Sequence, residues 1–204
     1  MQTPIHIAGA GATGSWTALA LSKLGFGCIE VWDFDRVEIP NVGVQVYNEA
    51  DVGEFKATAL KRLVPGVRPT VGPYEPGESP PRVLVLGVDT LAARRSIVDA
   101  VMAQPHRPQY VIDVRLGALA GAVLTALPHQ SAAMQAYRET LCGDEISGSC
   151  GLKGSPHMAM LAAAVTAHTV LTCLRDTDVP AWVSMDFQTA YPSAQVFLRK
   201  WAVE

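Results

Sequence analysis

Three glycines near the N-terminus have the spacing of a phosphate-binding turn. Gly9, Gly11 and Gly14 occur in the segment IAGAGATGSW, which follows a short apolar run and opens a helical pattern. A side chain at either of the first two glycines would keep a phosphate from the backbone, and the free amides of the first helical turn, around Ala12 and Thr13, favour an anion. The pattern predicts a nucleotide-binding turn, and the alternative is a tight strand-to-helix turn without a ligand.

An acidic residue follows at the end of the next predicted strand. Asp33 stands 19 residues beyond Gly14, where a carboxylate can accept hydrogen bonds from ribose hydroxyls. A nicotinamide dinucleotide, a flavin dinucleotide and ATP all fit the pattern up to this point. The glycine turn and Asp33 together therefore predict a nucleotide without selecting one.

Strands and helices alternate in the sequence around these residues. Apolar runs predict strands, and apolar residues at helical spacing predict helices. The predicted strands are 4–8, 28–33, 82–87, 109–113, an antiparallel 116–126 and a terminal 194–200. The predicted helices are 14–24, 56–64, 90–103 and 156–175. The segments 34–55 and 128–150 are predicted to be irregular, and 68–81 is predicted to be a loop around a short strand. This order predicts a single α/β domain over 1–204, with a mostly parallel sheet and helices on both faces.

Composition excludes several classes of function. The 204 residues are 49% hydrophobic and carry a net charge of −3 without a basic stripe, so we expect no nucleic-acid partner. The longest apolar run, 158–174, is interrupted by threonine and histidine and predicts a buried helix rather than a membrane span. None of the four cysteines forms a C-x-x-C pair, which favours a reduced, cytoplasmic protein.

The segment from Gly9 to Lys56 resembles the ThiF/MoeB/HesA family of adenylyltransferases, which activate sulfur carriers and ubiquitin-like proteins. The matching features are Asp33-x-Asp35-x-Val37, Asn41-x-x-x-Gln45 and Asp51-x-Gly53-x-x-Lys56. Further along, LVLGVDTLAARR resembles the second acidic segment of the family and contains Asp89. The segment SCGLKGSPHMAMLAAAVTAHTVL resembles the one that carries the catalytic cysteine of the family, here Cys150. The likeness extends over about residues 4–175.

The resemblance implies a Rossmann-like fold that binds ATP and Mg²⁺ and adenylates the C-terminal glycine of a small β-grasp protein, with some members then transferring the acyl group to a cysteine. By position, Gly11 and its neighbours would hold phosphates and Asp33 the ribose, with Asp35 and Gln45 in the same site. Asn41 and Lys56 would contact the triphosphate, Asp89 would coordinate magnesium, and Cys150, before a helix, would be the acceptor thiol. Residues 127–150 would form the crossover loop above the tail of the substrate.

Each assignment has a simpler alternative. Asp89 would equally serve as the N-cap of the helix 90–103. Lys56 would be an ordinary solvated lysine at a helix start, Asn41 a turn residue after proline, and Cys150 an incidental cysteine.

The sequence also departs from the family pattern. The family places an arginine in N-x-x-R-Q, and here that position is Val44, so a cation at the transition state is missing. Four other arginines are candidates to replace it: Arg36, Arg94, Arg95 and Arg115. Arg115 is the preferred candidate, because the Asp113-x-Arg115 pair stands at a strand end. The N-terminal helix and the zinc-binding C-x-x-C pairs of many relatives are absent, so no structural zinc is expected.

Three functions remain open from the sequence. The first is an ATP-dependent activating enzyme that works as a homodimer, like its relatives. The second is a catalytically weakened binding module of the same fold, which Val44 favours. The third is a nicotinamide- or flavin-dependent oxidoreductase, which leaves Asp35, Asn41, Lys56 and Asp89 without a purpose.

Overall fold

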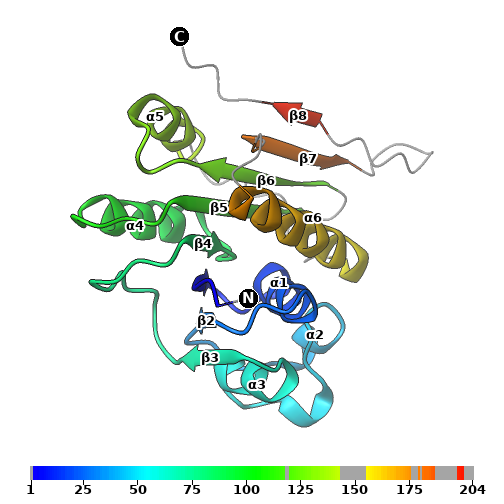
Figure 1. The fold of residues 1–204 in the computed structure, drawn as a ribbon. Coiled ribbons are helices and arrows are strands. Elements are labelled where there is room, and N and C mark those ends of the chain that lie inside the picture. Colours follow the sequence, from blue (N-terminus) through cyan, green and yellow to red (C-terminus); the bar gives the residue numbers. More distant parts are fainter. Residues whose placement is uncertain are drawn as a thin grey trace.

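A computed structural model describes residues 2–117, 120–142, 155–175, 179, 181–186 and 197–199. Its strands form one eight-stranded sheet in the order β3-β2-β1-β4-β5-β6-β7-β8 (Figure 1). The parallel part consists of β1 (Ile5–Ala8), β2 (Ile29–Trp32), β3 (Val67–Thr70), β4 (Val83–Leu86) and β5 (Tyr110–Leu116). The antiparallel part consists of β6 (Ala120–Ala126), β7 (Trp182–Asp186) and β8 (Phe197–Arg199).

Helices cover both faces of this sheet. One face packs against α1 (Ala12–Lys23), α3 (Lys56–Leu63) and α6 (Pro156–Leu174). The other packs against α4 (Leu91–Met102) and α5 (Ser131–Glu139), and Figure 1 shows these two groups on opposite sides. A short helix, α2 (Ile39–Val42), and a 3-10 turn, η1 (Glu49–Asp51), lie between β2 and α3. The architecture confirms the predicted fold class: Rossmann-like, mostly parallel, with helices on both faces and an antiparallel C-terminal part.

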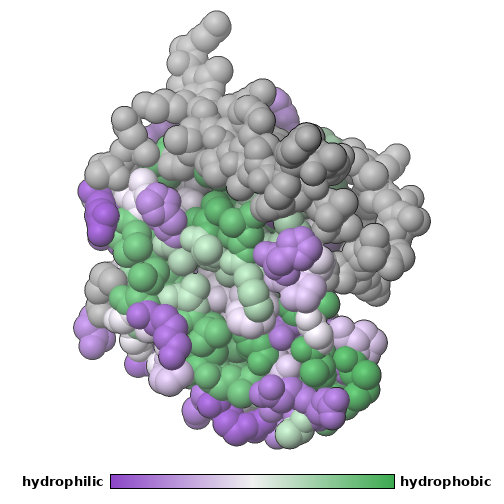
Figure 2. Space-filling view, turned by 90° about the vertical axis from the view of Figure 1, so that its right-hand side faces the viewer, coloured by the Kyte–Doolittle hydropathy of each residue, from purple (hydrophilic) through white to green (hydrophobic). Residues whose placement is uncertain are grey.

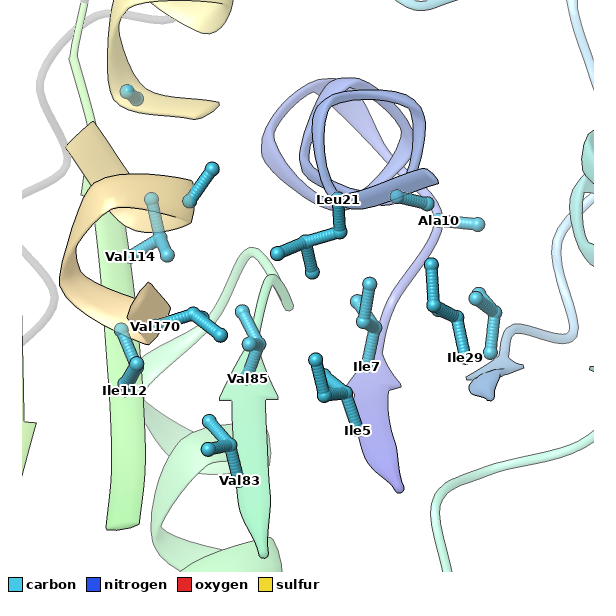
Figure 3. Close-up of a cluster of buried hydrophobic side chains, with 14 of the residues drawn as sticks. Ile5, Ile7, Ala10, Leu21, Ile29, Val83, Val85, Ile112, Val114 and Val170 are labelled. Atoms are coloured by element: carbon cyan, nitrogen blue, oxygen red, sulfur yellow. The ribbon is translucent and has the colours of Figure 1, made fainter. Parts of the chain in front are cut away.

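The central strands are buried on both faces because alternate side chains point to opposite sides of a strand. In β4, Val83 and Val85 face α1 and α6, while Leu84 and Leu86 face α4, and none of the four is exposed. Figure 3 shows the first of these cores, in which Leu21 of α1 closes over the sheet. Burial on both faces explains why the strand sequences are uniformly apolar.

The most apolar helix, α6, lies inside this core. By length and composition it is apolar enough to cross a membrane, but half of that stretch is buried in the fold. It packs against α1, β5 and β6. Three threonines on it donate to the carbonyls one turn earlier, for example Thr166 Oγ1 to Ala162 O at 2.7 Å. The prediction of a buried helix over 156–175 is confirmed.

The structure corrects several sequence predictions. The segment 128–150 is not irregular throughout, because 131–139 forms α5. The segment 34–55 contains α2 and η1, and β7 was not predicted at all. Residues 143–154, which hold the remainder of the predicted crossover loop and Cys150, lie outside the described residues.

Candidate functional site

The loops that carry the predicted site leave the same edge of the sheet. Ala8, Trp32 and Leu86 are register partners at the carboxyl ends of the neighbouring strands β1, β2 and β4. Gly9, Asp33 and Gly87 follow them directly. The helix after β1 lies on one face of the sheet and the helix after β4 on the other, which makes this edge the crossover point where open α/β sheets bind ligands.

The three glycines of the turn have different roles. Gly9 has a φ of 96°, and a Cβ there would lie 2.9 Å from the backbone of Gly87. A Cβ on Gly14 would lie 1.9 Å from the carbonyl oxygen of Gly9. The fold itself therefore requires glycine at positions 9 and 14. At position 9 the reason is close backbone packing, and not the access of a phosphate alone.

Gly11 is the glycine that packing does not explain. It is the N-cap of α1 with an extended backbone (φ −74°, ψ −154°), and a Cβ there would meet no atom within 4 Å. The first helical amides, at Ala12, Thr13 and Gly14, have no acceptor within the helix, whose first bond runs from Ser15 N to Gly11 O at 2.9 Å. The open space beside Gly11, together with amides that have no acceptor within the helix, fits an anion such as a phosphate.

Asp33 holds the glycine turn in place. One carboxylate oxygen accepts from Ala10 N at 2.6 Å and the other from Asp35 N at 2.7 Å. Burial raises the pKa of Asp33, while these two amides and the charge of Lys56 lower it in part. The carboxylate therefore has a structural role at the turn, and each oxygen keeps acceptor capacity for a further donor such as a hydroxyl.

Lys56 begins α3 and is buried rather than solvated. Its Nζ donates to Asp35 Oδ2 at 2.9 Å in an ion pair, and its backbone amide donates to Asp35 O at 2.8 Å. Only 8% of the residue is exposed. The alternative of an ordinary surface lysine is therefore wrong, since this ammonium is held beside Asp35 close to the end of β2.

Tyr47 joins the glycine turn to Lys56 and was missed in the sequence. Its hydroxyl lies 2.8 Å from Ala10 O and 3.2 Å from Lys56 O, and the single proton serves one carbonyl at a time. Burial raises the pKa of Tyr47 far above its usual range. The only available signal was a tyrosine inside a polar connection, which does not identify a partner.

Asn41 and Gln45 shape the connection between β2 and α3. Asn41 Oδ1 accepts from Glu38 N at 2.9 Å and so caps α2, while Asn41 O accepts from Gln45 N at 2.8 Å. The Oε1 atom of Gln45 is buried without a hydrogen-bond partner. At Val44, the carbonyl accepts from Trp16 Nε1 at 2.7 Å, which ties this segment to α1.

Asp89 is not the cap of α4. That position belongs to Thr90, whose Oγ1 accepts from Ala93 N at 3.1 Å. Asp89 is exposed, and within the described residues its carboxylate has no hydrogen bond or ion pair. The capping alternative is therefore wrong, and a free carboxylate stands on the loop beside the glycine turn.

Two of the arginines proposed to replace the missing cation are engaged away from the site. The Arg36 guanidinium stacks over Phe55 at 3.9 Å from the ring centroid and donates to Gly53 O at 2.6 Å. Arg95 donates to Leu141 O at 2.5 Å. Neither side chain is free to approach the glycine turn in this conformation.

The other two arginines share one buried carboxylate. Arg94 and Arg115 both bind Asp113, the second through Nε at 2.8 Å. Arg115 also donates to the backbone and the hydroxyl of Thr140, at 3.0 and 2.8 Å. Each side-chain nitrogen of Arg115 thus has an acceptor, and these bonds hold the guanidinium between Asp113 and Thr140.

The cysteines and acidic groups do not add a second site within the described residues. Cys142 is exposed, Cys28 is half-buried and Cys173 is buried. Across the described part of the chain, no three His, Cys, Asp or Glu side chains gather in a way that would hold a metal ion. A single carboxylate such as Asp89 still suits Mg²⁺, which commonly takes its other ligands from phosphates and water.

The fold and the site define an α/β protein with a glycine turn and acidic residues at the crossover edge of its sheet. The chain belongs to the ThiF family, whose model matches residues 2–191. A rice (Oryza sativa subsp. japonica) protein, adenylyltransferase and sulfurtransferase MOCS3, is 43% identical over 56 residues, which are 27% of this chain and 13% of that protein.

Solved structures share the fold across nearly the whole chain. PaaA has a TM-score of 0.71 at 19% identity, covering 97% of this chain and 73% of that one. E. coli MccB with AMPCPP and MccA has a TM-score of 0.67 at 16% identity, covering 99% of this chain and 66% of that one. E. coli MccB with ATP has a TM-score of 0.66 at 15% identity, covering 97% of this chain and 65% of that one. The chain thus spans about two thirds of MccB and a small part of the rice protein.

Proposed function

We propose that this protein uses ATP to adenylate the C-terminal glycine of a small β-grasp protein, a ubiquitin-like or sulfur-carrier protein. The observation that carries the proposal is that four groups lie on segments that leave one edge of the sheet: the open space at Gly11, the carboxylate of Asp33, the buried ammonium of Lys56 and the carboxylate of Asp89, which has no partner within the described residues. Membership of the ThiF family supports it and speaks against a nicotinamide- or flavin-dependent oxidoreductase.

The chemistry needs positive charge where this edge supplies it. When a carboxylate attacks the α-phosphate, negative charge grows on the non-bridging oxygens, and donors fixed in a dry site stabilise it best. The amides of the first turn of α1 and the ammonium of Lys56 are such donors. Asp89 would hold Mg²⁺, which neutralises phosphate charge when it is bound. Asp33 would accept from the ribose.

The nature of the substrate rests on the relatives. MccB structures contain ATP, AMPCPP or MccA, and the rice relative is named an adenylyltransferase and sulfurtransferase. These names are consistent with adenylyl transfer from ATP, and we propose that here the acceptor is the C-terminal carboxyl group of a partner chain. We further propose that the thiolate of Cys150 attacks the acyl-adenylate, forming a thioester and releasing AMP. Cys150 lies outside the described part of the structure.

We also propose a homodimer in the cytoplasm. Figure 2 shows the side of the molecule where α1, α2 and α6 lie in Figure 1, and apolar residues form a broad area across it. Ile39 of α2 is 66% exposed and Met160 of α6 is 47% exposed. Large exposed apolar areas commonly mark contacts between proteins.

A second candidate is a ThiF-fold module that binds nucleotide and partner but adenylates poorly. Two observations favour it: Val44 replaces the arginine of the family motif, and each of the four candidate arginines is engaged elsewhere. A valine cannot stabilise phosphate charge.

ATP–pyrophosphate exchange separates these candidates. With a sulfur-carrier protein that ends in Gly-Gly, we expect exchange that disappears when the last glycine of the carrier is removed. The same truncated carrier is the matched control, because its fold is unchanged. Nucleotide binding without exchange with any β-grasp partner would favour the weakened module over the activating enzyme.

A further inference from the structure

A buried charge cluster lies under the loop that carries Asp89. Asp113 of β5 has no exposed surface and accepts from Arg94, Arg115 and Tyr137, the last at 3.2 Å. Arg94 belongs to the first turn of α4 and is 5% exposed. A guanidinium this enclosed does not reach a substrate, so its role must be exerted through the protein groups that it touches.

Those groups are the backbone on either side of the cluster. Besides the Asp113 carboxylate, the Arg94 guanidinium donates to Val88 O on the β4–α4 loop and to Val114 O on β5, the latter at 3.0 Å. The Val88 carbonyl and the Asp89 amide belong to the same planar peptide unit. Fixing that carbonyl therefore fixes the orientation of the peptide that leads into Asp89.

The loop is also held at both of its ends. Gly87 N donates to Ala8 O at 2.8 Å, and Thr90 caps α4 through Ala93 N. Between these points, Thr13 Oγ1 donates weakly to Gly87 O at 3.5 Å, and Arg94 is the side chain that binds the Val88 carbonyl among the described residues. Asp113 in turn orients Arg94, because its ion pair with the carboxylate fixes the direction in which the guanidinium points.

We propose that Arg94 is a positioning residue: it locks the Val88–Asp89 peptide to the end of β5 and so places the Asp89 carboxylate for Mg²⁺ and phosphate. This inference rests on the proposed function, in which Asp89 holds the metal. Groups that orient a metal ligand are commonly worth about 10- to 100-fold in metal affinity.

The neighbouring arginine offers a matched control. Arg95 is on the same helix but donates to Leu141 O, at the end of α5, and not to the loop. Arg94→Met removes the contacts to Val88 and Asp113, while Arg94→Lys keeps one charge and cannot reach all the acceptors at once. Arg95→Met changes the same type of side chain without touching the Val88 carbonyl.

The test uses Mn²⁺ as the metal and AMPCPP as the nucleotide, with Mn²⁺ affinity measured by electron paramagnetic resonance. We expect Arg94→Met to weaken Mn²⁺ binding about 10- to 100-fold, Arg94→Lys to lie between it and the wild type, and Arg95→Met to match the wild type. Hydrogen exchange of the peptide over 87–93 should also quicken in Arg94→Met, without any nucleotide present.

The outcomes are separable. A folded Arg94→Met protein that binds Mn²⁺·AMPCPP like the wild type, with unchanged exchange over 87–93, overturns the positioning role. If Arg94→Met does not fold, Arg94→Lys decides by the same two readouts. A wild-type protein that binds no Mn²⁺·AMPCPP contradicts the proposed function instead, and the hydrogen-exchange comparison still shows whether Arg94 holds the loop.

Discussion

Asp113→Ala is expected to lower the free energy of unfolding by about 3–5 kcal/mol, the range for removing one partner of a buried ion pair. Arg94, 5% exposed, would lose the Asp113 carboxylate, and its charge would remain in the interior. Arg115 would lose a 2.8 Å ion pair and Tyr137 an acceptor. Urea unfolding followed by circular dichroism measures the difference.

Asp99→Ala is the matched control for this prediction. Asp99 also pairs with an arginine, Arg138, but the two side chains are 61% and 47% exposed, so the loss should be about 0–1 kcal/mol. If Asp113→Ala also loses only about 0–1 kcal/mol, the Asp113 cluster is not a stabilising feature of the fold.

Lys56→Met is expected to slow ATP–pyrophosphate exchange by about 10²- to 10³-fold, the usual effect of removing one fixed donor from developing negative charge. Lys56 is buried, and its ammonium is held by Asp35 close to the glycine turn. Stability should change little, because the Asp35 side chain that loses its partner is 55% exposed and stays hydrated.

Lys61→Met provides the comparison. Lys61 lies on the same helix, α3, and is exposed. It should exchange pyrophosphate at the wild-type rate. A Lys56→Met protein with wild-type exchange would remove this ammonium from the mechanism, whatever its thermal stability.

The sequence predicts the elements whose burial is simplest. The central strands are apolar throughout because both faces are covered, and α1 ends where glycine at position 25 takes a φ of 86°. The helix α5 was missed because it buries only Ala133, Met134 and Tyr137 in an otherwise polar stretch. Short elements such as α2 and β7 are set by packing and pairing with distant strands.

The candidate site likewise contains residues that local spacing predicts and contacts between distant segments that it does not. The glycine turn, Asp33 and Asp89 follow from local spacing, because a strand end and a helix start are adjacent in the chain. The pairing of Arg94 with Asp113 joins residues 19 apart on separate elements, and the bridge from Tyr47 to Ala10 spans 37. Spacing alone also did not distinguish Asp89 from Thr90 as the cap of α4, since both residue types cap helices.

The departure at Val44 acquires a physical meaning in the structure. Its carbonyl, not its side chain, makes the contact to Trp16, so the backbone of the segment is kept while the cation is lost. Arg36, Arg94, Arg95 and Arg115 are all bonded to other parts of the fold. Lys56 is also paired, but its partner Asp35 belongs to the site, so among the described residues its ammonium is the cation that we assign to this edge. The proposed adenylation thus depends heavily on one lysine.

Calorimetric titration of the wild type and Gly11→Ala with Mg·ATP, and separately with NAD⁺, tests the central claim most directly. A methyl group at Gly11 meets no protein atom, so the variant should fold normally yet bind Mg·ATP at least about tenfold more weakly, a loss of about 1.4 kcal/mol. We predict that Mg·ATP binds the wild type and NAD⁺ does not. Tighter binding of NAD⁺, or Mg·ATP binding that is indifferent to the Gly11 methyl group, would contradict an ATP cradle at this turn.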